Sequence, residues 1–275
     1  MAGNTVLISP GSWIAEGIDW LNTNAHGLFR AISRGVEALL SVTEGTLLLL
    51  PAWSMIPALA LLAWLLLGGR SGLIVLGSLG FCLAAGLWDR SMQTIALVSV
   101  AVSIAVAIAF PLGILASRSR RVEAVLRPIL DIMQTVPPWV YLIPAVMIFS
   151  LGKVPALLAT VIYGIPPMLR ITTLAFREVP RDLIELGQAT GATPMQILGK
   201  IEIPAARKTL LVGLNQCILL SLAMVVLAGL VGAGGLGAEV TRGLTRMEMG
   251  LGLRAGLGIV AIAILLDRIS RKALE

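Results

Sequence analysis

Long apolar runs separated by short polar segments dominate the chain. Seven of them approach or reach the roughly 20 residues that a helix needs to cross about 30 Å of hydrocarbon. They cover residues 47–67, 71–88, 93–116, 136–151, 154–169, 209–231 and 251–266. The runs are unbroken, whereas the strands of a membrane barrel show short alternating segments. The pattern therefore predicts an all-α, polytopic helical membrane protein with about seven spans.

Residues 1–46 precede the first run and have a different pattern. Their apolar side chains recur every three or four residues, at Ile14, Ile18, Leu21, Leu28, Phe29, Ile32, Val36 and Leu39. This spacing is typical of a helix with one apolar face. We expect residues 1–46 to be an extracytoplasmic tail with an amphipathic helix on the membrane's outer face or on a partner, and residues 47–275 to be the membrane domain. A solvated tail with some helix is the alternative.

The composition excludes a water-soluble domain. Of the 275 residues 57% are hydrophobic and 13% are charged, against roughly 45–50% and about 25% in soluble domains. Cys82 and Cys217 both lie within apolar runs. We therefore expect them to be small buried residues and not a disulfide.

The Lys and Arg residues are distributed unevenly between the two sides of a seven-span arrangement. Fourteen of the 21 fall on one side, chiefly in the segments after the third and fifth runs and at the C-terminus. Basic loops stay in the cytoplasm. We therefore expect the N-terminus to lie outside and the C-terminus to be cytoplasmic.

The predicted spans contain few ionisable groups. Arg254 and Asp267 lie near the ends of the last run, and ion-coupled carriers usually need such groups near the middle of the membrane. The one Gly-Lys pair, Gly199–Lys200, is followed by Ile201 and does not form an ATP-binding loop. With one histidine, His26, and no metal-ligand spacing, the chain offers no visible catalytic or metal site. We expect no enzyme activity, no metal and no cofactor in this chain, and an energy source on another polypeptide.

Several polar and aromatic residues within the runs are candidates for a substrate pathway. They are Trp139, Tyr141, Tyr163, Asn215 and Gln216. The polar groups have a second interpretation as hydrogen-bond partners of neighbouring helices, and the aromatic residues a second one as interfacial anchors.

Two proline pairs fall inside the predicted spans. Pro137–Pro138 and Pro166–Pro167 interrupt helical hydrogen bonding. We expect the fourth and fifth spans to be kinked, or to begin and end, at these positions.

The polar segment 180–204 carries the most specific local signals. Asp182 falls in the first turn of a short predicted helix, and Gly191 is placed to end that helix in a left-handed conformation. Thr193, Pro194 and Gln196 then form the pattern of a capping box. The segment therefore predicts two short helices joined by a tight turn, which together form a compact protrusion suited to a cleft in a soluble partner.

The spacing of Glu185, Gly191, Ile201 and Pro204 resembles the EAA loop of ABC importer permeases. The sequence departs from that pattern at Leu186–Gly187, where two alanines are usual, and at Ile203, where leucine is usual. In that family the loop inserts into the ATP-binding subunit. The resemblance implies that the following residues contribute to this contact: Glu185, Ala189, Thr190, Gly191, Ala192, Ile201 and Pro204.

The resemblance extends over about residues 92–267. Gln134-Thr135-Val136-Pro137, Gly164-Ile165-Pro166-Pro167, Asn215-Gln216 and Gly234-Gly235-Leu236-Gly237 are similar to permease subunits of glycine betaine/proline-type importers. This implies the type I ABC importer transmembrane fold in a bacterial inner membrane, and a compatible solute such as glycine betaine, proline, choline or a related trimethylated amine. It also implies ATP and Mg on ATP-binding subunits, an extracytoplasmic solute-binding protein and a second permease copy, and no nucleic acid.

Two other classes of function stay open on the sequence alone. An ion-gradient carrier would lose uptake when the gradient collapses and keep it when ATP is depleted. A membrane scaffold would show no uptake at all.

Overall fold

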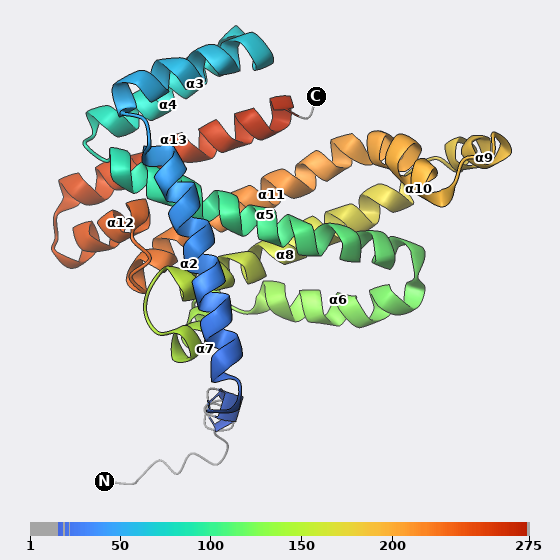
Figure 1. The fold of residues 1–275 in the computed structure, drawn as a ribbon, viewed down its shortest axis with the longest axis horizontal. Coiled ribbons are helices and arrows are strands. Elements are labelled where there is room, and N and C mark those ends of the chain that lie inside the picture. Colours follow the sequence, from blue (N-terminus) through green and yellow to red (C-terminus); the bar gives the residue numbers. More distant parts are fainter. Residues whose placement is uncertain (1–15, 19, 22, 274–275) are drawn as a thin grey trace.

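The structure is a computed structural model that describes residues 16–18, 20–21 and 23–273 (Figure 1). These residues form helices joined by short loops, without strands. The all-α prediction is confirmed. The helices are α2 (His26–Leu48), α3 (Ala52–Leu67), α4 (Gly69–Ala84), α5 (Trp88–Arg118), α6 (Arg120–Thr135), α7 (Pro138–Phe149), α8 (Lys153–Arg177), α9 (Arg181–Ala189), α10 (Pro194–Ile197), the π-helical turn Leu198–Glu202, α11 (Ile203–Leu230), α12 (Gly235–Thr245) and α13 (Met249–Ala273).

Four helical stretches of the described chain are each long and apolar enough to cross a membrane. They are α5, α8, α11 together with the α10 turn that continues into it, and α13. They contain the predicted spans 93–116, 154–169 and 251–266, and all of 209–231 except its last residue. Two bent pairs raise the number to six, and the short apolar helix α4 covers most of 71–88.

The remaining two predicted spans are not continuous helices. Residues 47–67 are divided between α2 and α3, which meet at 91°. Residues 136–151 hold only α7, which lies at 97° to α6. Prolines explain both breaks, because Pro51 and the pair Pro137–Pro138 lie at the starts of α3 and α7 and lack the amide that would continue the preceding helix.

The second proline pair has a different outcome. Pro166 and Pro167 lie inside α8, which continues to Arg177. Both prolines are buried within the bundle. Neighbouring helices shield the backbone groups that the prolines leave unpaired, so the helix need not end there.

At the centre of the bundle, α8 packs against both α5 and α11. Small residues line these contacts, and Ala105 on α5 is fully buried. A Cβ atom added to Gly164 on α8 would lie 3.0 Å from Sγ of Cys217 and 3.5 Å from Cβ of Ala105. Close backbone approach through small residues is the usual basis of helix packing in membranes. Cys217 and Cys82 are both buried and free, as predicted from their apolar surroundings.

Helix α2 crosses the bundle instead of running along it (Figure 1). Leu40 is buried, and the rings of Phe29 and Phe149 make an edge contact with centroids 5.5 Å apart. Nζ of Lys153 lies 2.6 Å from a carboxylate oxygen of Glu44. Of the apolar residues predicted for an amphipathic helix, Leu28, Phe29, Ile32, Val36 and Leu39 lie on α2, which packs on its own chain, and Ile14 lies outside the described residues. The placement of residues 1–46 as an extracytoplasmic tail stays a prediction.

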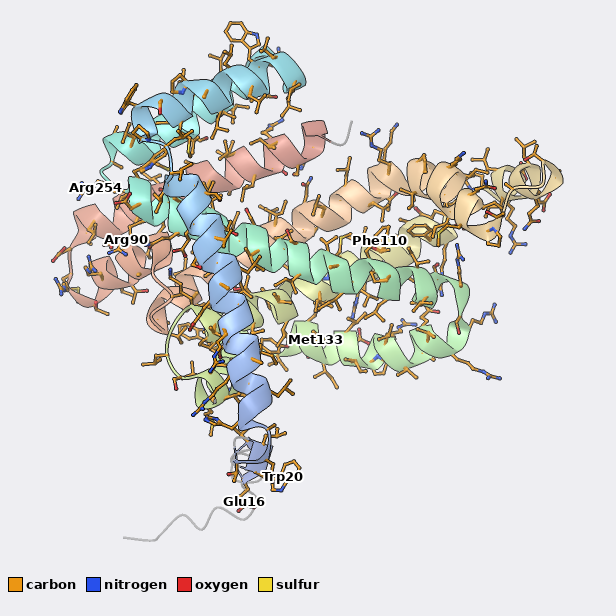
Figure 2. All side chains as sticks on the ribbon, in the orientation of Figure 1. Glu16, Trp20, Arg90, Phe110, Met133 and Arg254 are labelled. Atoms are coloured by element: carbon orange, nitrogen blue, oxygen red, sulfur yellow. The ribbon has the colours of Figure 1, made fainter. Side chains whose placement is uncertain are left out.

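The bundle has two distinct ends. Helices α9 and α10 project at one end, and we call residues 181–202 the knob (Figure 1). Arg90 and Arg254 lie near the opposite end, beside α12 (Figure 2). Helix α5 runs from that end to the knob end.

The contact at Gly164 generates a stability prediction. In Gly164→Val the added methyl groups collide with Cys217 and Ala105, which is expected to cost about 1–3 kcal/mol as overpacking. The measurement is the thermal unfolding midpoint of the purified chain in detergent. Gly77→Val in α4 is the matched control, because an added Cβ atom there meets no atom within 4 Å. Equal midpoints for the two variants would contradict the packing assigned to Gly164.

Candidate functional site

The first helix of the knob ends at the predicted position. Gly191 has a φ of +74°, in the left-handed region that favours glycine. Its amide donates to the carbonyl of Gln188, and the amide of Ala192 donates to the carbonyl of Gly187, each at 3.0 Å. These bonds satisfy the carbonyl groups at the end of α9 and turn the chain back sharply.

The capping box predicted for the second helix is also present. Oγ1 of Thr193 accepts a hydrogen bond from the amide of Gln196 at 3.4 Å, and Oε1 of Gln196 accepts one from the amide of Thr193 at 2.8 Å. Pro194 occupies the first helical turn. The segment from Pro194 to Leu230 is then one continuous helical stretch that includes the π-helical turn. The knob is therefore joined to the spanning helix α11 without a flexible loop.

Gly187 explains one departure from the EAA pattern. A Cβ atom at this position would lie 2.6 Å from Cδ1 of Ile201 and 3.2 Å from Cγ1 of Ile197. The glycine therefore lets α9 pack directly on the second half of the knob. Ile201, one of the predicted site residues, is partly buried by this contact.

The outer surface of the knob combines predicted and unpredicted residues. Five of the predicted contact residues are exposed and Ala192 is half-buried; the exposed ones are Glu185, Ala189, Thr190, Gly191 and, just beyond the knob at the start of α11, Pro204. Leu186 and Met195 lie on the same protrusion with 61% and 76% of their surfaces exposed. Apolar residues this exposed outside the spanning helices indicate a contact surface. The sequence pattern did not identify either residue as part of the contact.

Ion pairs fix the knob end of the bundle. Nη2 of Arg118, the last residue of α5, lies 2.6 Å from Oε2 of Glu202 in the knob. Both carboxylate oxygens of Glu123 accept from Arg177 at 2.6 Å. The sequence pattern identified none of these partners, because each pair joins residues more than 50 positions apart.

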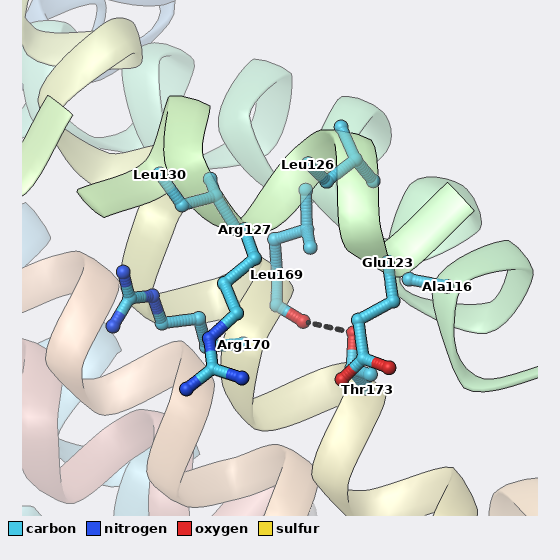
Figure 3. A pocket seen from close by; sticks show the side chains of 8 residues that line it. All are labelled: Ala116, Glu123, Leu126, Arg127, Leu130, Leu169, Arg170 and Thr173. Atoms are coloured by element: carbon cyan, nitrogen blue, oxygen red, sulfur yellow. Dashed lines mark hydrogen bonds between the residues drawn. The ribbon is translucent and has the colours of Figure 1, made fainter. Parts of the chain in front are cut away.

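A small pocket lies beside these ion pairs, between α6 and the knob ends of α5 and α8 (Figure 3). Its volume is about 150 Å³, and it is lined by Ala116, Glu123, Leu126, Arg127, Leu130, Leu169, Arg170 and Thr173. None of the predicted pathway residues lines it. Among the described residues, no group of three or more His, Cys, Asp or Glu side chains is placed to hold a metal.

The structure brings together only part of the predicted substrate pathway. The rings of Tyr141 and Tyr163 lie 6.5 Å apart, and the hydroxyl of Tyr141 donates to the carbonyl of Met133 at 2.6 Å. Trp139, on the same helix as Tyr141, is 55% exposed. These three aromatic residues lie on α7 and α8.

The two amide residues of the predicted pathway lie elsewhere, on α11. Asn215 is buried, and its Oδ1 accepts a hydrogen bond from the hydroxyl of Ser270 on α13 at 2.7 Å. Gln216 is exposed. The bond of Asn215 matches the interpretation of a polar contact between neighbouring helices.

The capping box yields a local prediction. Thr193→Ala removes the acceptor for the amide of Gln196 and is expected to destabilise the second knob helix by about 1 kcal/mol. Hydrogen exchange of that amide in the purified protein should accelerate about fivefold. The control is Thr245→Ala, because the Thr245 hydroxyl bonds only to carbonyl groups of its own helix. Unchanged exchange in Thr193→Ala would contradict the role of the cap.

Comparison with known proteins places this geometry in a family. Residues 107–271 match the family described as the binding-protein-dependent transport system inner membrane component. The chain is 43% identical to the glycine betaine/proline betaine transport system permease protein ProW of Escherichia coli (strain K12) over 265 residues, which cover 96% of this chain and 75% of that protein. It is 41% identical to the glycine betaine transport system permease protein OpuAB of Bacillus subtilis (strain 168) over 256 residues, 92% and 90% of the two chains.

A solved structure has a similar helical arrangement over part of this chain. An inward-facing MetNI methionine ABC transporter chain matches with a TM-score of 0.57 and 26% identity, over 69% of this chain and 96% of that chain. The match agrees with the predicted type I importer fold, and the family match contains the knob, α8, α11 and the last part of α5. The chain belongs to the family of binding-protein-dependent transport system inner membrane components, the permeases of ABC importers.

Proposed function

We propose that this chain forms the membrane pathway of an ATP-driven importer for a compatible solute. The solute class is glycine betaine, proline, choline or a related trimethylated amine. The observation that carries the proposal is the exposed knob, which continues without a flexible loop into α11. The names of the similar permeases, which specify glycine betaine and proline betaine, support the solute class.

The knob is the contact for an ATP-binding subunit. Its outer surface presents the carboxylate of Glu185 beside the exposed apolar side chains of Leu186 and Met195. A compact protrusion with apolar residues beside a charged group fits a cleft in a soluble partner. ATP and Mg bind on that partner, and closure of two such subunits moves the knob and, through α11, the membrane bundle.

The basic residues support one orientation of the chain in a bacterial inner membrane. Arg70 lies at the turn between α3 and α4, Arg118 and Arg120 at the turn between α5 and α6, and Arg268 near the end of α13. These two turns and the C-terminal end of α13 lie toward the knob end of the bundle (Figure 1), which basic side chains mark as cytoplasmic. The N-terminus is then outside and the C-terminus cytoplasmic, with lipid around the apolar helices.

The opposite end receives the solute. An extracytoplasmic solute-binding protein delivers it there, and a second copy of the permease completes the pathway as a homodimer. Aromatic faces attract quaternary ammonium groups, so Tyr141, Tyr163 and Trp139 are the side chains best suited to contact the solute. Asn215 and Gln216 contribute polar groups from α11. This site binds weakly, because selection belongs to the binding protein.

The first functional prediction concerns the knob. Glu185→Lys reverses the charge at the centre of the contact surface and is expected to weaken binding of the ATP-binding subunit at least about tenfold. The measurement is co-purification of that subunit with the tagged permease. Glu248→Lys is the matched control, an exposed charge reversal at the opposite end. Undiminished co-purification of the Glu185 variant would overturn the proposed contact, provided that both variants keep the thermal midpoint of the native protein.

The second functional prediction concerns the energy source. In proteoliposomes containing permease and ATP-binding subunits, uptake of labelled glycine betaine should require both ATP and the solute-binding protein. It should persist when ionophores abolish the proton and sodium gradients, because the predicted spans contain few ionisable groups for ion coupling. Uptake that follows the ion gradient and ignores ATP would establish a secondary carrier. The absence of uptake with all components present would support a scaffold.

A further inference from the structure

In the described part of the chain, two glutamates are the only buried charged residues. Glu202 is 8% exposed in the knob, and Glu239 is 4% exposed in α12 at the opposite end of the bundle. Each glutamate forms an ion pair with an arginine of α5. Arg118 of α5 binds Glu202 at 2.6 Å, and Arg90 of α5 binds Glu239 at 3.0 Å.

Buried glutamates in a membrane protein need such partners. A buried carboxylate carries a large desolvation cost unless it is paired and hydrogen-bonded. Glu239 meets this requirement with a second arginine, because Nη1 of Arg242 lies 2.9 Å from its other oxygen. Removing Arg118 would leave the buried carboxylate of Glu202 without its ion-pair partner.

Helix α12 is attached to α5 by more than this pair. Oε1 of Gln93 accepts from the amide of Gly235, and Oγ1 of Thr94 accepts from the amide of Leu236, both at 2.9 Å. These amides belong to the first turn of α12, whose donors have no partner within the helix. Arg90, Gln93 and Thr94 are spaced three and four residues apart and therefore share one face of α5. That face holds the start of α12 in a fixed position.

Helix α5 connects the two attachments as a single element. It is an unbroken helix of 31 residues from Trp88 to Arg118. A helix of this length extends about 45 Å at 1.5 Å per residue. It packs against α8 more extensively than any other two helices pack. Pro111 lies within it and removes one backbone hydrogen bond without ending the helix.

We infer that α5 is a mechanical rod that transmits displacement of the knob to α12. The ion pair Arg118–Glu202 is its joint with the knob. The ion pair Arg90–Glu239 is its joint with α12, at the mouth of the bundle, which is the end opposite the knob. All four are positioning residues, because they act through α12 and touch no solute. The inference rests on the proposed function, in which the ATP-binding subunit moves the knob. Helix α12 then opens or closes the mouth at which the solute enters.

A linkage in series has a distinctive energetic signature. If α5 transmits the movement, loss of either joint interrupts the same path, so removal of both has no greater effect than removal of one. If each pair only stabilises its own surroundings, the two losses lie far apart and their effects add.

The test uses the complete importer in proteoliposomes, with the variants Arg118→Gln, Glu239→Gln and their combination. Each single variant is expected to lower ATP hydrolysis stimulated by the solute-loaded binding protein about tenfold, and the combination is expected to lower it no further. Glu123→Gln is the matched control, because it removes the two-bond ion pair with Arg177 at the knob end and leaves in place the hydrogen bond from Arg177 to the carbonyl of Ala116 on α5. It should keep the stimulation within about twofold of the native value.

A labelling experiment reports on α12 itself. Leu244 on α12 is 75% exposed, so Leu244→Cys offers a thiol to a membrane-impermeant reagent, while the native cysteines are buried. ATP should change the labelling rate in the otherwise native importer and in Glu123→Gln, but not in Arg118→Gln, although Arg118 lies at the other end of α5. Co-purification of the ATP-binding subunit with every variant verifies that the knob contact persists.

Three results would overturn the inference in an importer that transports. They are additive losses in the double variant, an ATP response of Leu244→Cys that survives Arg118→Gln, and the absence of any ATP response in the native background. Failure of the proposed function is distinguishable, because the importer without substitutions would then neither bind the ATP-binding subunit nor transport.

Discussion

The knob cannot lie in hydrocarbon, yet it cannot separate from the membrane bundle. Its helix ends, its capping hydrogen bonds and its charged side chains all need water or a polar partner. Its last turn nevertheless continues into α11 as one helical stretch. This combination fixes a rigid polar body at the boundary of the membrane. The docking of the ATP-binding subunit, the orientation of the chain in the membrane and the transmission of movement all depend on this position of the knob.

The close packing of the bundle favours transmission of a displacement of the knob to the membrane helices. Small residues bring α5, α8 and α11 into close backbone contact, as at Gly164, where even a Cβ atom would be crowded. Closely packed interiors transmit displacement because they have little free volume. The ion pairs of Arg118 and Arg90 add directional attachments at the two ends of α5. Switching between inward- and outward-facing arrangements then involves bodies of several helices.

Local signals allowed part of this structure to be predicted from the sequence. Four spans followed from hydropathy, and the turn at Gly191 and the capping box at Thr193 followed from residues within a few positions of one another. The family resemblance, confirmed by comparison, rested on the same short-range spacing around Glu185. The predicted contact residues of the knob stay predictions, although most of them are exposed.

What the sequence did not reveal depends on contacts between distant segments. The crossing of α2, the burial of Glu202 and Glu239 and the bond between Asn215 and Ser270 have no local signature. The packing of Gly187 against Ile201 has no local signature either. In the sequence, this glycine is visible only as a departure from the family pattern. In each case the partner lies too far along the chain for periodicity or spacing to identify it.

The most direct test of the central claim is an experimental structure of the permease assembled with its ATP-binding subunits and the solute-binding protein. We expect residues 181–202 to be seated in a cleft of each ATP-binding subunit, with Glu185, Leu186 and Met195 at the contact, and the binding protein to lie at the α12 end. A knob that touches no ATP-binding subunit, or that lies on the same side as the binding protein, would overturn the proposed coupling.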